Sequence, residues 1–299
     1  MSFSLSGLPA FEYFQPTTIR EALDLMREFP SACIYAGGTD LFPRLRKQII
    51  SGDVLIDLKW INDFPETMIQ ANGDLVINPL TTFSHLQAYL EMIPAGEVLS
   101  DAIHQLGTRS LRNRATLAGN LCNASPAADA SASLLVYDAI VKLQSVQGER
   151  DVPVCEFFVG PGKSVIQTGE LLTGITIPVQ EPHSRGTYLK ISRNKVADLA
   201  ICGVAVLGYP DAQHGCGFNF RIAVSGANAI PVVVPGVWDI LSTTMNQACL
   251  MKAAREVANS VTPLSDVRST REYRKEMVYE LTLQALTQTL QKFGVEVAQ

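Results

Sequence analysis

The sequence predicts an α+β fold in two domains, and three observations lead to this prediction. The chain has 299 residues, of which 47% are hydrophobic and 18% charged, a globular balance in a chain too long for one small core. Helix and strand signals alternate before residue 180 without a repeated strand–helix–strand unit. Residues 178–186 (PVQEPHSRG) contain two prolines and have the composition of a linker. We therefore predict a boundary at residue 180, between domains of residues 1–180 and 181–299.

The first domain begins with a predicted helix over residues 18–29. Thr18 and Glu21 have the spacing of a capping box, and apolar residues recur along one face of the segment. Residues 68–78 are predicted to form a hairpin with a type I′ turn at Asn72-Gly73. The other predicted elements are strands at 32–36, 54–58, 139–144 and 171–177 and helices at 39–47, 83–91, 96–106 and 127–138.

The second domain is predicted to be a three-stranded sheet followed by helices. The strands are expected at 187–192, 200–208 and 218–225, and the helices at 247–259 and 272–293. The chain lacks a run of about 20 apolar residues and a basic segment followed by an apolar stretch at its start. These features predict a soluble, cytoplasmic protein without membrane insertion. The net charge of −5, from 24 basic and 29 acidic residues, argues against a nucleic-acid partner.

No motif for hydrolysis, nucleotide-triphosphate binding or metal binding stands out. The six cysteines are scattered without a CxxC pair, and the four histidines are equally dispersed, so we expect free thiols and no metal site. The segment Gly162-Lys163-Ser164 lacks the first glycine of a P-loop, where Phe157 stands. The chain has neither a Rossmann fingerprint nor a Gly-x-Ser-x-Gly elbow. We assign no catalytic acid, base or nucleophile.

The first segment that suggests a ligand is residues 36–41, Ala-Gly-Gly-Thr-Asp-Leu, directly after a predicted strand. The two glycines permit positive φ, so that successive amides can point into an anion-binding concavity, and the Thr39 hydroxyl adds a donor. Asp40 would repel an anion, and its side chain is expected to turn back and cap the loop or helix. A strand-to-helix turn without a ligand is the alternative.

The second segment, residues 116–129, carries small residues, hydroxyls and amides that suit close approach to a large polar ligand. The stretch of residues 107–126 has no clear period, and a helix is expected to follow it. Asp129, in the first turn of that helix, can accept a hydrogen bond from a ribose hydroxyl. The alternative is that Asp129 complements the helix dipole.

Together the segments AGGTDL and LRNRATLAGNLCNASPAAD resemble the FAD-binding medium subunit of the molybdenum hydroxylases. This family includes xanthine dehydrogenase and carbon monoxide dehydrogenase. Two further segments agree with the family in the same order along the chain. The first is FFVGPG at 157–162, followed by ELL at 170–172 and ITIP at 175–178, and the second is KISRNKVADLA at 190–200. The resemblance thus spans nearly the whole chain.

The resemblance implies both a fold and a cofactor. Residues 1–180 would form a two-lobed FAD domain of the vanillyl-alcohol-oxidase (PCMH) type. Residues 181–299 would form a carbon monoxide dehydrogenase flavoprotein-like C-terminal domain, a three-stranded sheet with helices. The implied FAD-binding residues are Tyr35, Ala36, Gly37, Gly38, Thr39, Asp40, Leu41, Thr116, Gly119, Asn120, Asn123, Ser125, Asp129, Leu172 and Lys190.

Specific roles are implied for these positions. Residues 35–41 would hold the pyrophosphate through main-chain groups, and Asp129 would hold the ribose. Leu172 would offer its backbone near the flavin ring, and Lys190 would lie close to the flavin. At Asn78-Pro79, this sequence departs from the family's Gly-Ala, which places bulkier residues near the expected flavin wall.

The function implied is electron transfer within a multi-subunit molybdenum-containing hydroxylase. A small subunit with 2Fe-2S clusters and a large molybdopterin-binding subunit would be the partners. Electrons would pass from the clusters through FAD to an external acceptor such as NAD, a quinone or oxygen. The alternatives are a stand-alone FAD-dependent oxidoreductase and a scaffold subunit without cofactor.

Overall fold

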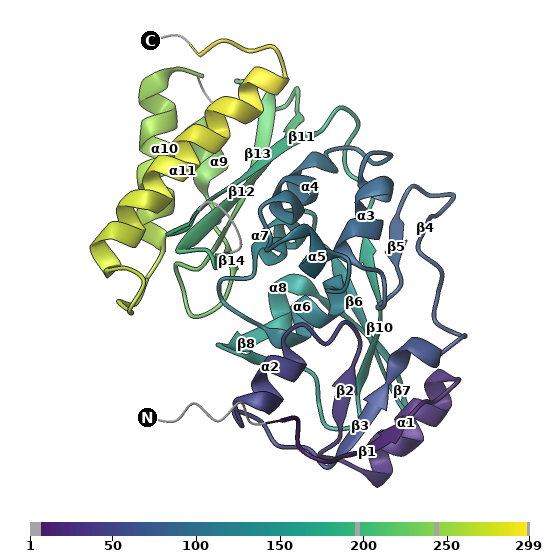
Figure 1. The fold of residues 1–299 in the computed structure, drawn as a ribbon. Coiled ribbons are helices and arrows are strands. Elements are labelled where there is room, and N and C mark those ends of the chain that lie inside the picture. The colour runs from purple at the N-terminus through teal and green to yellow at the C-terminus, as the bar shows by residue number, and fades with distance from the viewer. Residues whose placement is uncertain (1–6, 195–197, 242–244, 298–299) are drawn as a thin grey trace.

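The computed structural model describes residues 7–194, 198–241 and 245–297, and the predicted α+β class is confirmed. Three larger sheets of three, five and four strands follow one another along the described chain. Figure 1 shows the N-terminal lobe at the bottom of the molecule and the two C-terminal helices at the top left.

The N-terminal lobe contains a small parallel sheet. Its strands, in spatial order, are β1 (Glu12–Phe14), β3 (Val54–Asp57) and β2 (Cys33–Tyr35). Helix α1 (Ile19–Glu28) packs its apolar face on this sheet, and Thr18 caps it as predicted by accepting the Glu21 amide at 3.1 Å. The lobe also holds α2 (Leu41–Arg46) and the short helix η1 (Leu58–Trp60). It has a core of its own, to which β10 adds Leu171.

The second lobe is built on a five-stranded antiparallel sheet. The spatial order is β4 (Met68–Ile69), β5 (Leu75–Ile77), β10 (Leu171–Ile177), β6 (Ile140–Ser145) and β7 (Gly148–Pro153). The helices of the lobe are α3 (Phe83–Leu90), α4 (Glu97–His104), α5 (Arg109–Arg112), α6 (Leu117–Asn123), α7 (Asp129–Val136) and α8 (Val154–Phe157). The two-stranded ribbon β8 (Phe158–Gly160) and β9 (Lys163–Ser164) follows α8.

The predicted hairpin at residues 68–78 is present as β4 and β5, but the predicted type I′ turn is wrong. A type I′ turn needs positive φ at both central residues. Among the described residues, Gly73 has φ +92°, whereas Asn72 is not in the positive-φ region. The Gly73 amide donates to the Gln70 carbonyl at 2.9 Å and the Gln70 amide to Asp74 at 2.8 Å. The connection is therefore a hairpin loop of more than two residues, in which a turn without positive φ is followed by a glycine with positive φ.

The segment of residues 107–126, for which no period was found, is also helical in part. It contains α5 and α6, each begun by a threonine whose hydroxyl accepts an amide three residues on, Thr108 from Leu111 and Thr116 from Gly119. The two helices have only four and seven residues. Two turns or fewer are too short to show an apolar period in the sequence.

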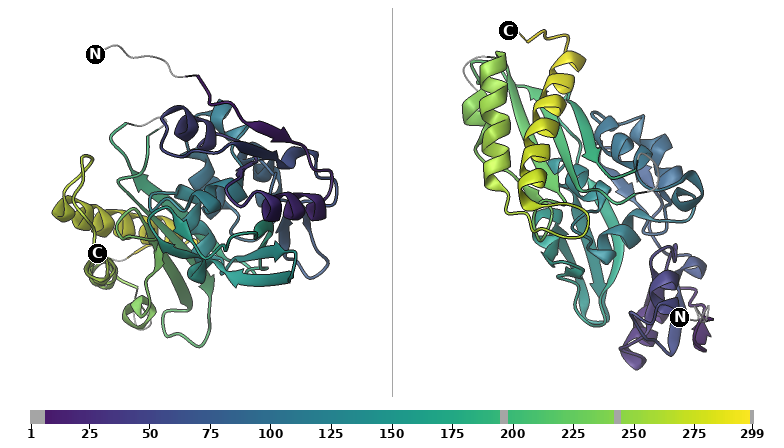
Figure 2. Two further views of the ribbon diagram at one scale, coloured as in Figure 1. Left: turned by 90° about the horizontal axis from the view of Figure 1, so that it is seen from below. Right: turned by 60° about the vertical axis from the view of Figure 1, so that its left-hand side comes forward.

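The C-terminal sheet lies between two layers of helices. Its three predicted strands are β11 (Arg185–Ile191), β12 (Cys202–Pro210) and β13 (Phe218–Ser225), and the two-residue β14 (Val232–Val233) adds an edge. Helices α10 (Gln247–Ser260) and α11 (Arg271–Lys292) cover one face, after the short α9 (Val237–Leu241). Helices α4 and α7 of the second lobe cover the other face, as the right-hand view of Figure 2 shows.

The chain around residue 180 is packed against its surroundings. The Gln180 side chain is buried and donates to the Tyr137 carbonyl at 3.1 Å. Tyr188, Ala205 and Ala223 of the C-terminal sheet belong to the same apolar core as α4 and α7. The boundary at residue 180 stays a prediction, and the core crosses it. None of the described helices has the length and apolar character needed to span a bilayer.

Candidate functional site

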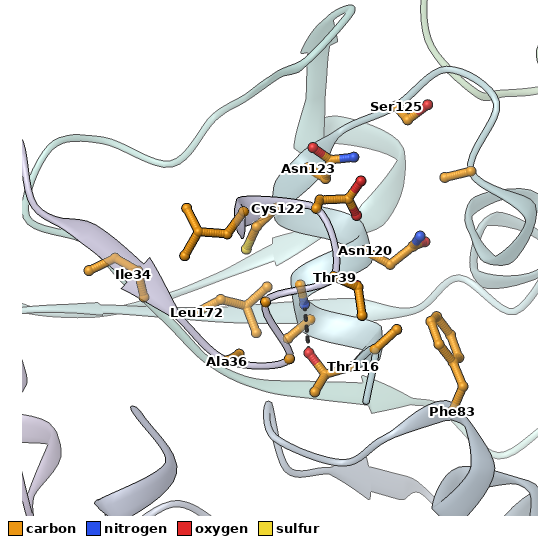
Figure 3. A pocket seen from close by; sticks show the side chains of 18 of the residues that line it. Ile34, Ala36, Thr39, Phe83, Thr116, Asn120, Cys122, Asn123, Ser125 and Leu172 are labelled. Atoms are coloured by element: carbon orange, nitrogen blue, oxygen red, sulfur yellow. Dashed lines mark hydrogen bonds between the residues drawn. The ribbon is translucent and has the colours of Figure 1, made fainter. Parts of the chain in front are cut away.

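A cavity of about 630 Å³ lies between the N-terminal lobe and the second lobe. Its walls come from the end of β2 and the loop into α2, from α6 and the segment leading into α7, and from the start of β10. Figure 3 shows Ile34 of β2, Asn120 and Cys122 of α6 and Leu172 of β10 around it. Of the residues proposed from the sequence, all line this cavity except Tyr35 and Lys190.

The two glycines of the first segment are held where a side chain would not fit. A Cβ on Gly37 would lie 2.2 Å from the carbonyl oxygen of Arg114, in the segment on the opposite wall. Gly38 has φ +73°, and a Cβ there would lie 2.6 Å from the Tyr35 ring and 2.7 Å from the Phe42 ring. The loop is therefore pressed between two aromatic rings and the facing backbone, which only glycine allows.

Tyr35 serves as a support for this loop. Its ring packs edge-on against Phe42, with 4.9 Å between centroids, and Lys59 Nζ lies 3.1 Å from its centroid. Its hydroxyl accepts from Arg114 Nη2 at 3.1 Å, which ties the loop to the opposite wall. Lys59 is in turn paired with the buried Asp57 at 2.5 Å.

The expectation that Asp40 caps the loop or helix is wrong. Asp40 stands at the N-cap of α2, but its backbone is already helical (φ −100°, ψ −39°) and its side chain makes no capping bond. Side-chain capping requires extended backbone at this position. Asp40 instead lines the cavity, where burial raises the pKa of its carboxyl and nearby Arg44 opposes that rise. Arg44 itself donates to Asn123 Oδ1 across the cavity at 3.2 Å.

The second segment presents polar atoms from α6. The Thr116 hydroxyl accepts the Gly119 amide at 3.0 Å, the dashed line in Figure 3. Asn120 Oδ1 is buried and has no hydrogen-bond partner within the described part of the chain. A buried acceptor without a partner costs free energy unless a ligand or water satisfies it. Because Asn120 lines the cavity, its amide is suited to a polar ligand there.

The loop between α6 and α7 is fixed from two sides. Ala124 has φ +46°, and its carbonyl accepts the Gly162 amide at 2.9 Å. The Pro126 carbonyl accepts the Gly226 amide, from the end of β13, at 2.7 Å. These bonds hold Ser125 on the cavity wall between them.

Asp129 is the buried carboxylate of the wall. Its Oδ2 accepts from Lys190 Nζ at 2.9 Å and its Oδ1 from the Tyr188 hydroxyl at 2.8 Å, both from β11. Burial raises the pKa of Asp129, while Lys190 and Tyr188 lower it. Lys190 also donates to the Asp198 carbonyl at 3.2 Å. The structure thus brings Lys190 to Asp129 but not to the cavity wall.

Several lining residues were missed by sequence reasoning. Arg44, Phe83 and Cys122 line the cavity. Cys122 lies between Asn120 and Asn123 in a segment already chosen, whereas Phe83 carried no signal because it is distant in sequence. Of the Asn78-Pro79 pair, Pro79 lines the cavity, while Asn78 Oδ1 accepts the Leu80 amide at 2.8 Å in a local turn.

Comparison with known proteins matches nearly the whole chain. Residues 9–180 match the family described as FAD binding domain in molybdopterin dehydrogenase, and residues 187–289 match the CO dehydrogenase flavoprotein C-terminal domain. The glyceraldehyde dehydrogenase medium chain of Sulfolobus acidocaldarius is 27% identical over 93% of this chain and 97% of its own. The nicotine 6-hydroxylase medium subunit of Paenarthrobacter nicotinovorans is 30% identical over 92% of this chain and 95% of its own.

The fold has a close counterpart among solved structures. A crystal structure of the Cu,Mo-CO dehydrogenase in a cyanide-inactivated form contains a chain that superposes with a TM-score of 0.88. The identity is 25%, and the match covers 95% of this chain and 99% of that one.

Proposed function

Since the chain belongs to the FAD-binding medium subunits of the molybdenum hydroxylase family, we propose that its cavity holds FAD for electron transfer within a multi-subunit dehydrogenase. Electrons enter from 2Fe-2S clusters on a small partner subunit and leave to an external acceptor. The observation that carries the assignment of the site is the cavity itself, whose opposing walls are the two segments predicted to bind FAD.

The residues present fit this cofactor. Without side chains at Gly37 and Gly38, the loop can pack against the rings and backbone behind it. Its own backbone lines the cavity, where successive amides can bind a pyrophosphate. Asn120 offers an acceptor that has no partner among the described residues, and Asp129 offers carboxylate oxygens to the ribose hydroxyls. Residues 36–41 would hold the pyrophosphate with Thr116 and Gly119, and Leu172 would lie against the ring.

The chain contributes binding and orientation, while the redox chemistry is the cofactor's. When bound, FAD accepts electrons singly and can release two together to an acceptor. The Arg114–Tyr35 hydrogen bond and the close contact of Gly37 with the Arg114 carbonyl keep the two walls at a fixed separation. We assign no general acid or base.

The partners are part of the proposal. A small iron–sulfur subunit and a large molybdopterin-binding subunit complete the assembly, and the substrate is oxidised on the large subunit. What supports this is that two relatives are described as the medium chain of a glyceraldehyde dehydrogenase and the medium subunit of a nicotine 6-hydroxylase. We also propose that residues 1–180 are the FAD domain and 181–299 its companion, with the matched ranges 9–180 and 187–289 as support. The scattered cysteines support a cytoplasmic location.

The test is purification of the chain alone and of the native complex. We expect the isolated chain to bind FAD, seen by flavin absorbance, and to oxidise no organic substrate without its partners. The native complex should contain molybdenum and iron. Turnover by the isolated chain would favour a stand-alone oxidoreductase, and a chain that stays colourless after FAD addition would favour a scaffold.

A further inference from the structure

Tyr188 of β11 is a fully buried tyrosine whose hydroxyl contacts Asp129, a residue of the cavity wall. It is 1% exposed, and its hydroxyl donates to Asp129 Oδ1 at 2.8 Å. The other carboxylate oxygen, Oδ2, accepts from Lys190 Nζ at 2.9 Å. Asp129 lines the cavity and Tyr188 does not. Tyr188 therefore acts on the cavity only through the carboxylate that it holds.

The C-terminal sheet provides the space that this hydroxyl occupies. Gly203 of β12 lies opposite Lys190 in one strand pair and opposite Ser225 of β13 in the next. A Cβ on Gly203 would lie 2.3 Å from the Tyr188 hydroxyl oxygen and 2.9 Å from Ser225 Oγ. Strands β11, β12 and β13, all after residue 180, thus fit closely around the Tyr188 hydroxyl. This hydroxyl holds the carboxylate of Asp129, which lies before residue 180.

We propose that Tyr188 is a positioning residue for FAD: its hydroxyl holds the Asp129 carboxylate in the orientation that accepts a hydrogen bond from the nucleotide ribose. This rests on the proposed function of the cavity. With the hydroxyl removed, Lys190 is the one described residue still bonded to the carboxylate, which can then turn toward the ammonium group and away from the ligand. A hydrogen bond to a charged group contributes enough that its loss weakens binding about tenfold.

The charge state of Asp129 provides a second readout. Among the described residues, the groups that face it are Tyr188 and Lys190 of β11, with Ser225 of β13 and Cys202 of β12 beside the tyrosine. Burial raises the pKa of Asp129, and the Tyr188 hydroxyl lowers it by bonding to the charged form. Without that hydroxyl the pKa rises further. As the pH is lowered, FAD affinity should then begin to fall at a higher pH than in the wild type, because a protonated carboxyl is a weaker hydrogen-bond acceptor than a carboxylate.

The chain contains a matched control for this substitution. Tyr137 is also fully buried in the same core, and its hydroxyl donates to the Ala95 carbonyl at 2.7 Å and accepts the Leu99 amide at 3.1 Å. It does not line the cavity. Tyr188→Phe and Tyr137→Phe thus each remove one buried hydroxyl with its hydrogen bonds, and only the first touches Asp129.

The experiment measures FAD dissociation constants from pH 5 to 8, by flavin fluorescence, for the full chain and both variants. Thermal unfolding of the apoproteins reports folding. We expect Tyr188→Phe to bind FAD about tenfold more weakly, with its pH profile moved upward, and Tyr137→Phe to match the wild type in both. A second variant, Gly203→Ala, keeps the tyrosine but places a methyl group on β12 that pushes the Tyr188 hydroxyl out of position. It should weaken FAD binding in the same way.

The outcomes separate this inference from the proposed function. Wild-type affinity in folded Tyr188→Phe and Gly203→Ala, with the wild type binding FAD, would overturn the role of Tyr188 and leave the FAD site in place. An equal loss in Tyr137→Phe would also overturn it, because the effect would then be structural. A wild-type chain that does not bind FAD would overturn the proposed function and the inference with it.

Discussion

Gly38 shows how one residue without a side chain shapes the cavity. It combines a positive φ of +73° with two aromatic rings at less than 3 Å from where a Cβ would stand. Those rings, of Tyr35 and Phe42, are themselves packed edge to face. A methyl group here cannot enter unless a ring moves, and movement of Tyr35 would break its hydrogen bond to Arg114 on the opposite wall.

We therefore predict that Gly38→Ala weakens FAD binding by at least about tenfold. The control is Gly217→Ala, because Gly217 has a similar φ of +77° but no described residue within 4 Å of its Cβ position. Both changes place alanine at positive φ, which destabilises by about 1 kcal/mol. Only the first should lower the flavin content of the purified chain. Equal flavin content in both variants would contradict the role of the loop.

At the scale of single residues, the sequence identified the site residues that belong to short, recognisable segments. Glycine pairs, amides and a carboxylate in two segments were found by pattern, and nearly all of them line one cavity. Tyr188 was missed although a signal existed. Residues i and i+2 of a strand lie on one face, so Lys190, already assigned to the site, pointed to Tyr188 as its neighbour.

Among the elements, the long ones were predictable and the short ones were not. Helices α10 and α11 and the strands β11 to β13 have enough residues to display a period, and they fall where expected. Helix α6, which carries Thr116 and Asn120, has seven residues and is defined by its cap more than by its apolar face. Residue pairs contacting across the cavity, such as Arg44 and Asn123, are set by tertiary packing, which local patterns do not encode.

A buried arginine of helix α11 adds hydrogen bonds to the apolar packing of this helix on the C-terminal sheet. Arg274 is 4% exposed, and its Nη1 donates to the carbonyls of Ile201 and Gly226. Its Nη2 pairs with Asp266 at 2.8 Å. Gly226 also donates to Pro126 on the loop before α7, so the arginine supports a contact that reaches the cavity loop.

Replacing Arg274 with methionine should destabilise the protein by about 3 kcal/mol, because buried carbonyls lose their donor and Asp266 loses a partner. Urea unfolding measures this, with Arg20→Met as a control. Arg20 pairs with Asp24 on the surface, with side chains 65% and 40% exposed, where such pairs contribute little. A loss no greater than that of the control would contradict the role of Arg274.

The Arg274–Asp266 ion pair makes the free energy of unfolding depend on pH. Hydrogen bonds from Arg268 and Arg274 hold the pKa of Asp266 well below its ordinary value of 3.8. A carboxyl with a lowered folded-state pKa stabilises the fold above its unfolded pKa, and this stability is lost as pH falls below about 3.8. We expect the acid-induced loss in urea titrations to be smaller in Arg274→Met than in the wild type. An unchanged acid slope would show that Arg268 alone sets the pKa.

At the scale of the whole molecule, the two halves share a core. Helices α4 and α7 lie on the face of the C-terminal sheet opposite α10 and α11. Ala205 and Leu207 of β12 and Ala223 of β13 are buried in one cluster with residues of the second lobe. The N-terminal lobe, by contrast, has a core of its own, to which the second lobe adds Leu171, and the two lobes line the cavity together. The described packing thus divides the molecule less sharply at residue 180 than the linker composition indicated.

A chain cut at residue 180 should therefore not fold into a cofactor-binding domain. The cut uncovers the apolar faces of α4 and α7 and removes Tyr188 and Lys190, which leaves Asp129 buried without either partner. We expect residues 1–180 alone to bind no FAD and to show weak near-ultraviolet circular dichroism. Co-expression with residues 181–299 should restore both signals, because the two pieces together contain every contact of the shared core. FAD binding by the isolated 1–180 fragment, with native-like dichroism, would show that the second lobe folds without the C-terminal sheet and that Asp129 needs no partner from β11.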